Sequence, residues 1–106
     1  MADLIGALDR RLTLFRQRQV QNPDNGDVTV QWVPVASVWA SRRQLSGREV
    51  EFAAATRSAE ELRFRIRYRP DVSTTGRVEC EGVAYEIVRT EEIGRRRWLD
   101  IYARRV

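Results

Sequence analysis

The sequence predicts a mainly β fold, a small antiparallel β-barrel or sandwich of about six strands with one short α-helix inserted at about residues 46–57. Apolar and polar residues alternate along several segments, turn-forming residues separate those segments, and a single segment shows helical spacing instead. The 106 residues contain no internal repeat, linker or low-complexity tract. We therefore expect one domain over residues 1–106, with residues 1–9 as a flexible N-terminal segment.

The first half of the chain predicts two strands joined by a loop. Arg10–Gln17 alternates apolar and polar side chains, and Val28–Val33 does the same. Between them, Gln19–Asp27 contains Asn, Asp, Pro and Gly, which together predict a long hairpin loop. Pro34 then interrupts the alternation, which indicates a bulge or an edge position before the strand continues over Val35–Arg43.

The predicted helix begins with a capping signal. Ser46 and Glu49 have the spacing of a capping box, in which each side chain accepts a hydrogen bond from the backbone N–H of the other residue. Three apolar residues then share one helical face: Val50, Ala53 and Ala54. A capped helix inside a β-rich chain is an unusual insertion, so we expect it to serve as a contact surface.

Glu61–Arg69 has the clearest alternation in the chain. Its apolar face carries Leu62, Phe64, Ile66 and Tyr68, and its other face carries an arginine ladder, which consists of Arg63, Arg65, Arg67 and Arg69. Alternate residues on a strand lie roughly 6.8 Å apart, so the ladder spans about 20 Å. Two interpretations stay open. The ladder is a solvated face that forms cross-strand ion pairs with Glu79 and Glu81, or it faces another subunit or a phosphate backbone.

The last third predicts a hairpin and a final strand. Arg77–Glu81 and Ala84–Thr90 flank a tight turn, and Glu91–Gly94 forms the next turn before the strand Arg95–Arg104. That strand opens with three consecutive arginines: Arg95, Arg96 and Arg97. They are a solvated cluster or candidate contacts to DNA or a protein partner.

The composition excludes several classes of chemistry. All 19 basic residues are arginine, and with 15 acidic residues the net charge of +4 leans weakly towards an anionic partner. There is no histidine, so a Ser-His-Asp triad, a Cys-His dyad and the usual zinc sites cannot form. Cys80, the one cysteine, is expected to be a small buried hydrophobe in a reducing compartment. The sequence therefore predicts no enzyme, no cofactor and no metal.

No segment approaches the roughly 20 apolar residues that span a bilayer, and the first residues do not form a signal peptide. We expect a soluble chain that is intracellular when made, without a membrane partner.

An ordered set of motifs resembles one protein family. The motifs are Leu8–Leu14 at the first strand, Trp32, Val38–Ser41 before Leu45–Glu49, Ile66–Pro70, and Arg77-Val78 before Gly82–Ile87. In this order and spacing, over about residues 8–104, the chain resembles the head–tail joining proteins of long-tailed double-stranded DNA phages. These are also called head-closure or head-completion proteins. Prophages and gene transfer agents use relatives of the same part.

The resemblance implies a place in a particle. Members are small β-barrels with a helix packed on them, and they form a neck ring, usually of about twelve copies. The ring lies below the portal and its adaptor, extends the tunnel for packaged double-stranded DNA, and offers a docking face for the tail terminator or other tail proteins. The implied location is the head–tail interface of the virion, after assembly in the host bacterial cytoplasm.

The resemblance also implies candidate contact residues. In some members a long hairpin loop closes the tunnel, and the loop matching by position is Gln19–Asp27. Its candidate tunnel residues are Asn22, Asp24, Asn25 and Gly26. Arg48 and Glu51 on the predicted helix, and part of the arginine ladder, are candidate contacts to an adjacent copy or ring. Two alternatives remain, a barrel that binds nucleic acid through its basic face and a neighbouring tail component such as a tail terminator.

Overall fold

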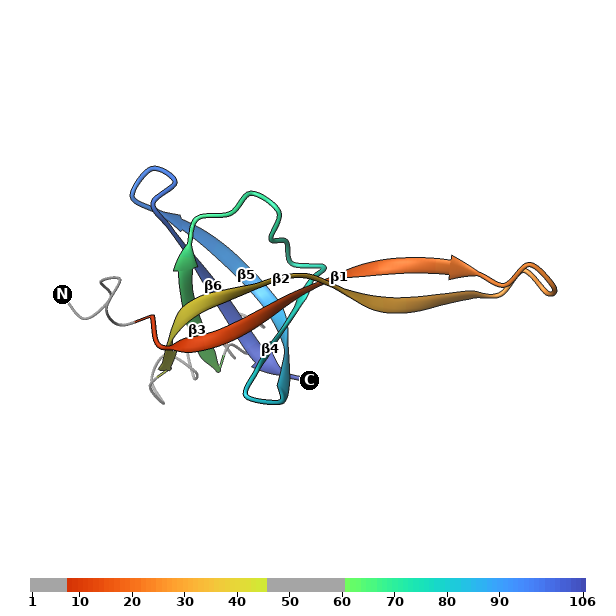
Figure 1. Ribbon diagram of the computed structural model, residues 1–106, viewed down its shortest axis with the longest axis horizontal. Helices are drawn as coiled ribbons and strands as arrows, with labels where there is room; N and C mark the ends of the chain where they lie inside the picture. The colour runs from red at the N-terminus through yellow and green to blue at the C-terminus, as the bar shows by residue number, and fades with distance from the viewer. Residues whose placement is uncertain (1–7, 46–60) are drawn as a thin grey trace, which may run out of the picture.

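The computed structural model describes residues 8–45 and 61–106. Within these residues, six antiparallel strands close into a barrel in the order β1-β2-β3-β6-β5-β4, with β4 pairing back to β1 (Figure 1). The strands are β1 (Arg10–Gln21), β2 (Val28–Gln44), β3 (Leu62–Arg67), β4 (Arg77–Cys80), β5 (Val83–Ile93) and β6 (Trp98–Arg105). The predicted fold class is confirmed.

Alternation along each strand fills the barrel interior. On β3, Phe64 and Ile66 are fully buried, as the pattern predicts, and the Phe64 ring lies edge-on to that of Tyr85 with centroids 5.5 Å apart. Cys80 is also fully buried, as expected. The remaining core residues are Leu12, Leu14, Ala40, Val78, Ile87, Leu99, Ile101 and Ala103.

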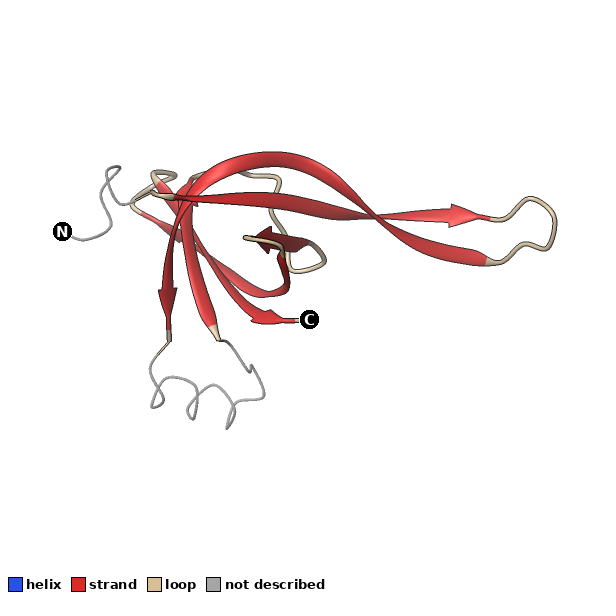
Figure 2. Cartoon of the chain, turned by 60° about the horizontal axis from the view of Figure 1, so that its bottom comes forward, coloured by secondary structure: helices blue, strands red, loops and turns tan. Residues whose placement is uncertain are grey.

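Two of the strands continue far beyond the barrel. β1 pairs with β4 only over Leu12–Phe15, and β2 pairs with β3 only over Ser41–Gln44. Past Phe15 and Pro34 the two strands pair only with each other, and they project as a ribbon that both views show (Figures 1 and 2). We call residues 16–33 the arm. At about 3.3 Å per residue, each of its strands adds about 20 Å.

A β-bulge marks the point where the arm leaves the barrel. Leu14 pairs with Ala36 but Phe15 pairs with Pro34, so Val35 is an extra residue on β2. The interruption predicted at Pro34 is therefore confirmed as a bulge. Because side chains alternate with a period of two, the extra residue moves the even-numbered residues of β2 to the opposite face of the ribbon.

The ends of the arm differ from the prediction. Gln19–Gln21 pair with Val28–Val30, so the hairpin loop is confined to residues 22–27. The predicted loop was too long because glutamines carry no strong strand signal, whereas here they continue a register already fixed by their neighbours.

The turn between β5 and β6 also differs from the prediction. β5 continues to Ile93 and β6 begins at Trp98, so the turn is Gly94–Arg97. Arg95 and Arg96 have positive φ angles of 50° and 64°, which a strand does not allow. The predicted strand start at Arg95 is therefore wrong, and the three arginines lie in the turn.

The predicted helix at about 46–57, with Arg48 and Glu51, lies outside the described residues, as do residues 1–7 of the N-terminal segment. No helix among the described residues is long and apolar enough to cross a membrane.

Candidate interaction surfaces

The arginine ladder of β3 lies on the outer face of the barrel, and its centre is a buried ion pair. Arg65 donates from Nε and Nη2 to the two carboxylate oxygens of Asp100 on β6, at 2.6 and 2.8 Å. The side chains are 14% and 2% exposed. A bidentate, desolvated pair of this kind fixes the strand register and leaves Asp100 with no access to a partner.

The other ladder residues also have neighbours within the chain. Arg67 is exposed and stacks over the Trp98 ring at 5.9 Å, whereas Arg69 donates to both oxygens of Asp71 at 2.9 and 2.7 Å. Arg63 is half-buried opposite Tyr102. Of the four, Arg67 is therefore the one that offers its side chain most openly to another molecule.

The predicted acidic partners of the ladder are not its neighbours. β4, which carries Glu79, pairs with β1 and β5, whereas β3 lies between β2 and β6. Glu81 accepts instead from Arg10 and lies 3.8 Å from Arg42. The prediction of cross-strand pairs with Glu79 and Glu81 is therefore wrong, because β3 and β4 are consecutive in the sequence but not adjacent in the barrel.

Four exposed arginines gather where β3 ends against the β5–β6 turn. We call Arg67, Arg95, Arg96 and Arg97 the arginine end. The backbone N–H of Tyr68 donates to the Arg97 carbonyl at 3.2 Å, which joins the turn to the strand end. Arg96 lies over the Tyr68 ring at 6.0 Å, as Arg67 does over Trp98. Stacking on aromatic faces restricts these guanidinium groups.

The tip of the arm, residues 22–27, has a defined shape. The N–H of Asn22 donates to the Asp27 carbonyl at 2.7 Å, and that of Gly26 donates back to Asn22 at 2.8 Å. The side chains of Asn22 and Asn25 accept at 2.9 Å from the N–H groups of Asp24 and Asp27. The structure thus brings the candidate tunnel residues together at one exposed tip. Their tunnel role stays a prediction.

The two faces of the arm differ in chemistry. One face carries uncharged side chains: Val28, Val30 and Trp32, opposite Gln21, Gln19 and Gln17. The other carries Arg16 and Arg18 beside Val33 and Gln31. Val28 and Val30 are 58% and 49% exposed, whereas Trp32 is half-buried under Arg77, whose guanidinium lies 4.2 Å from the ring centroid. Sequence reasoning did not identify this projecting arm, because the free strand edges arise only from the barrel topology.

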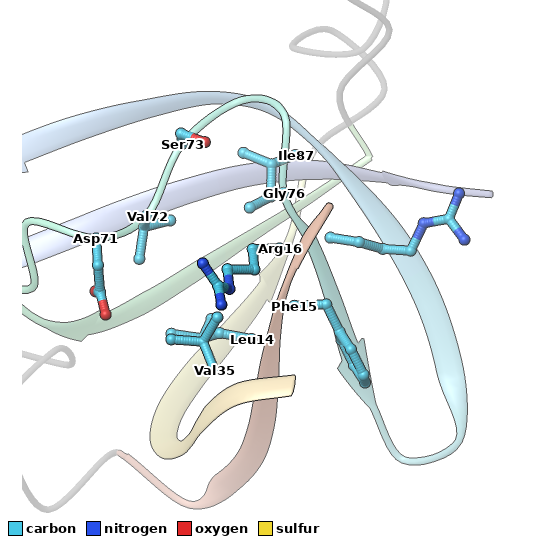
Figure 3. Close-up of a pocket in the computed structure, with 10 residues that line it drawn as sticks. Leu14, Phe15, Arg16, Val35, Asp71, Val72, Ser73, Gly76 and Ile87 are labelled. Atoms are coloured by element: carbon cyan, nitrogen blue, oxygen red, sulfur yellow. The ribbon is translucent and has the colours of Figure 1, made fainter. Parts of the chain in front are cut away.

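Two hollows accompany these surfaces. Leu14, Val35, Val72 and Ile87 lie around a cavity of about 20 Å³ at the base of the arm, which has room for a single water (Figure 3). A polar hollow of about 370 Å³ opens at one end of the barrel and is lined by Arg10, Arg42, Gln44, Glu61, Leu62, Tyr85 and Arg105.

The pKa shifts of Cys80 and Asp71 have structural causes, burial for the thiol and an ion pair for the carboxyl. Burial raises the pKa of the Cys80 thiol above its usual 9.0, which keeps the thiol protonated and unreactive. Hydrogen bonds from Arg69 hold the pKa of the Asp71 carboxyl below its usual 3.8, although partial burial opposes them. Among residues 8–45 and 61–106, no group of three or more Cys, Asp or Glu side chains could hold a metal ion.

Comparisons with known proteins place this barrel and arm in a family. Residues 4–106 match the family described as phage head completion protein. The solution structure of protein SF1141 from Shigella flexneri 2a has a TM-score of 0.80 and 26% identity, covering 95% of each chain. A chain from the virion of a native gene transfer agent particle has a TM-score of 0.58 and 20% identity, covering 92% of this chain and 94% of that one.

No curated protein matches the sequence. The likeness to the gene transfer agent chain shows a shared fold, and the family match covers nearly the whole sequence. The resemblance found in the strand motifs is thus confirmed. The chain therefore belongs to the phage head completion protein family and is a structural assembly protein.

Proposed function

We propose that copies of this chain form a ring in the neck of a phage-type particle, where they join the DNA-filled head to the tail and continue the DNA tunnel. The observation that carries the proposal is the match of residues 4–106 to phage head completion proteins. The shared fold of a chain from a gene transfer agent virion supports it. In this role the chain is not an enzyme, its neighbours are the portal or adaptor ring and the tail terminator, and packaged DNA passes through.

The form of the chain suits a ring subunit. The barrel is closed, and the arm reaches about 20 Å beyond it, far enough to touch an adjacent copy. Oligomerisation would also increase the surface buried by a small domain. Candidate contacts are Arg48 and Glu51 of the predicted helix, and the ladder residues Arg63, Arg67 and Arg69, of which Arg67 is exposed.

The role of Arg65 in this proposal is indirect. Its guanidinium is committed to Asp100, so charge reversal there would disturb the barrel before it disturbed an interface. Arg67 is the informative position, because it is exposed and forms no ion pair within the described residues. The variant Arg67→Glu should leave the fold intact and reduce the yield of joined particles.

Deletion of the gene in a producing strain tests the function. We expect heads and tails that assemble separately but do not join, with joining restored by the wild-type gene. Electron microscopy of the particle neck, at a resolution that traces the chain, should then show the barrel between portal and tail. Normal joined particles after deletion would contradict the proposal.

The second candidate is a barrel that binds nucleic acid, which the arginine end favours because its four cations form no ion pairs within the described residues. Binding of duplex DNA at two salt concentrations separates the two functions. A neck ring should bind weakly, because many fixed phosphate contacts would hold DNA that must move through the tunnel. Tight binding with a steep salt dependence would favour the second candidate.

A further inference from the structure

Ion pairing is uneven over the barrel surface. Several arginines of β1, β5 and β6 have a carboxylate partner: Arg10 pairs with Glu81, Arg104 with Glu86 and Arg89 with Glu91. In the part of the chain that the structure describes, none of the four members of the arginine end has one. The arginine end therefore presents four cations that no carboxylate among the described residues pairs with directly.

The side chains of the arginine end are partly held in place. Arg96 is placed over Tyr68 and Arg67 over Trp98, and the backbone hydrogen bond from Tyr68 to Arg97 joins the two segments. A planar guanidinium that is already positioned loses less freedom when it binds a carboxylate than a free side chain does. This arrangement favours a partner that presents carboxylates in a fixed geometry.

The arm tip presents such carboxylates. Asp24 and Asp27 are exposed, the residues 22–27 contain no basic side chain, and four hydrogen bonds fix the backbone around them. Among the described residues, neither carboxylate forms an ion pair. The tip is thus an acidic, shaped surface with a charge opposite to that of the arginine end.

The two surfaces cannot meet within one copy. The arm projects from one side of the barrel, and the β5–β6 turn lies towards the other end of the molecule, whose longest extent is 55 Å (Figure 1). Two complementary surfaces at opposite ends of a chain make a head-to-tail contact, and a repeated contact of this type closes into a ring when the rotation allows.

We propose that the arm tip of one copy docks on the arginine end of the next copy, with Asp24 and Asp27 accepting from the guanidinium groups of Arg95, Arg96 or Arg97. The inference rests on the proposed ring and names the contact that links its members. In this arrangement the tip is held by the neighbouring copy and does not lie across the tunnel.

Chemical cross-linking of two single variants tests the contact. Asp24→Cys protein is mixed with Arg96→Cys protein and treated with a short bis-maleimide, while Cys80 stays unreactive because it is buried. We expect a heterodimer yield at least about tenfold above that of Asp24→Cys mixed with Arg105→Cys, an exposed arginine at the other end of β6. The excess should disappear in 1 M salt, where the Debye length is about 3 Å.

Charge exchange sharpens the test. Adding Asp27→Arg to the first protein, or Arg95→Glu to the second, should each lower the yield about tenfold, and combining the two should restore it. Adding Glu79→Arg to the first protein is the matched control, because Glu79 is exposed but distant from the tip, and it should change nothing.

Three results would overturn the inference. They are a yield equal to the Arg105→Cys control, a yield indifferent to charge reversal, and protection of Arg96→Cys by duplex DNA without any heterodimer. The last would assign the arginine end to DNA. None of these results decides whether the chain lies in the neck, which the microscopy described above tests separately. If the two variants cross-link as expected but microscopy shows no copy of the chain in the neck, the proposed function is contradicted and the contact is not.

Discussion

The barrel and the arm share two strands, yet their side chains satisfy different requirements. In the barrel each strand buries one face, and even the outer face contains a desolvated pair between Arg65 and Asp100. In the arm each strand is paired along one edge only, and every side chain from Gln21 to Gln31 is exposed. A two-stranded ribbon has little stability of its own. Burial within the chain explains the side chains of the barrel, whereas it does not explain those of the exposed arm.

The largest loss should follow truncation of the barrel core. Phe64→Ala removes a fully buried ring that contacts Tyr85, and we expect the free energy of unfolding to fall by about 4 kcal/mol. Urea denaturation followed by tryptophan fluorescence measures this. The matched control on the arm is Val30→Ala, which should change stability by less than about 0.5 kcal/mol. Similar losses in both variants would contradict the distinction between the two regions.

The buried ion pair should give the next effect. Asp100→Ala leaves the Arg65 guanidinium without its carboxylate in a largely desolvated site, at an expected cost of about 3 kcal/mol. Glu91→Ala is the control, since its pair with Arg89 is exposed and contributes about 0–1 kcal/mol. The same denaturation experiment compares them, and equal costs would show that burial of the pair is unimportant.

The junction between barrel and arm should be sensitive to added volume. A Cβ at Gly76 would lie 2.9 Å from the Phe15 carbonyl oxygen and 3.2 Å from that of Ser73. Both are backbone atoms, so Gly76→Ala should cost about 1–3 kcal/mol. Gly82→Ala tests backbone strain in place of steric contact. A Cβ at Gly82 would meet no atom within 4 Å, but its φ of 80° lies in the left-handed region that residues with a Cβ rarely adopt. Hydrogen exchange should show that Gly76→Ala loosens the base of the arm, and unchanged exchange there would contradict this.

Apolar residues on the arm should matter little for folding. Replacing Val28 and Val30 together by Ser should shift stability by less than about 0.5 kcal/mol, because both are already about half exposed. If the uncharged face contacts another protein, the same variant should lower the yield of joined particles. A loss of several kcal/mol in the isolated chain would show instead that the arm is part of the folding unit.

A similarly small effect is expected from the pH dependence at Asp71. Because Arg69 lowers the pKa of this carboxyl in the folded chain, the pair stabilises the fold above the usual value of 3.8, and the contribution is lost as the pH falls through the folded value. Arg69→Ala should therefore cost about 0.5 kcal/mol at pH 7, a modest figure because the pair is largely solvated. Denaturation at pH 7 and at a series of acidic pH values should show this cost decreasing as Asp71 becomes protonated.

The sequence predicted what local patterns encode. Alternation placed Phe64 and Ile66 in the core, and Pro34 indicated the bulge. Local patterns did not predict which carboxylates pair with the arginines, because Arg65 and Asp100 are 35 residues apart and meet only through the pairing of β3 with β6. Consecutive strands usually pair, but β3 and β4 do not, so Glu79 and Glu81 were assigned wrongly.

The arginine end and the arm were missed for a related reason. Arg67 lies far in sequence from Arg95–Arg97, and only the barrel closure brings them together. The arm follows from where β2 stops pairing with β3, a boundary set by the whole barrel. Its sequence reads as ordinary strand and loop.

The bulge at Val35 determines on which face of the arm the side chains of β2 lie. Deleting this residue would leave both strands, the tip and the ribbon hydrogen bonds possible, but it would reverse the alternation of β2 relative to the barrel. Trp32 would then leave its place under Arg77 and turn with Val28 and Val30 towards the side now occupied by Arg16 and Arg18. A single extra residue thus keeps the apolar side chains of β2 and the arginines of β1 on opposite faces of the projecting ribbon.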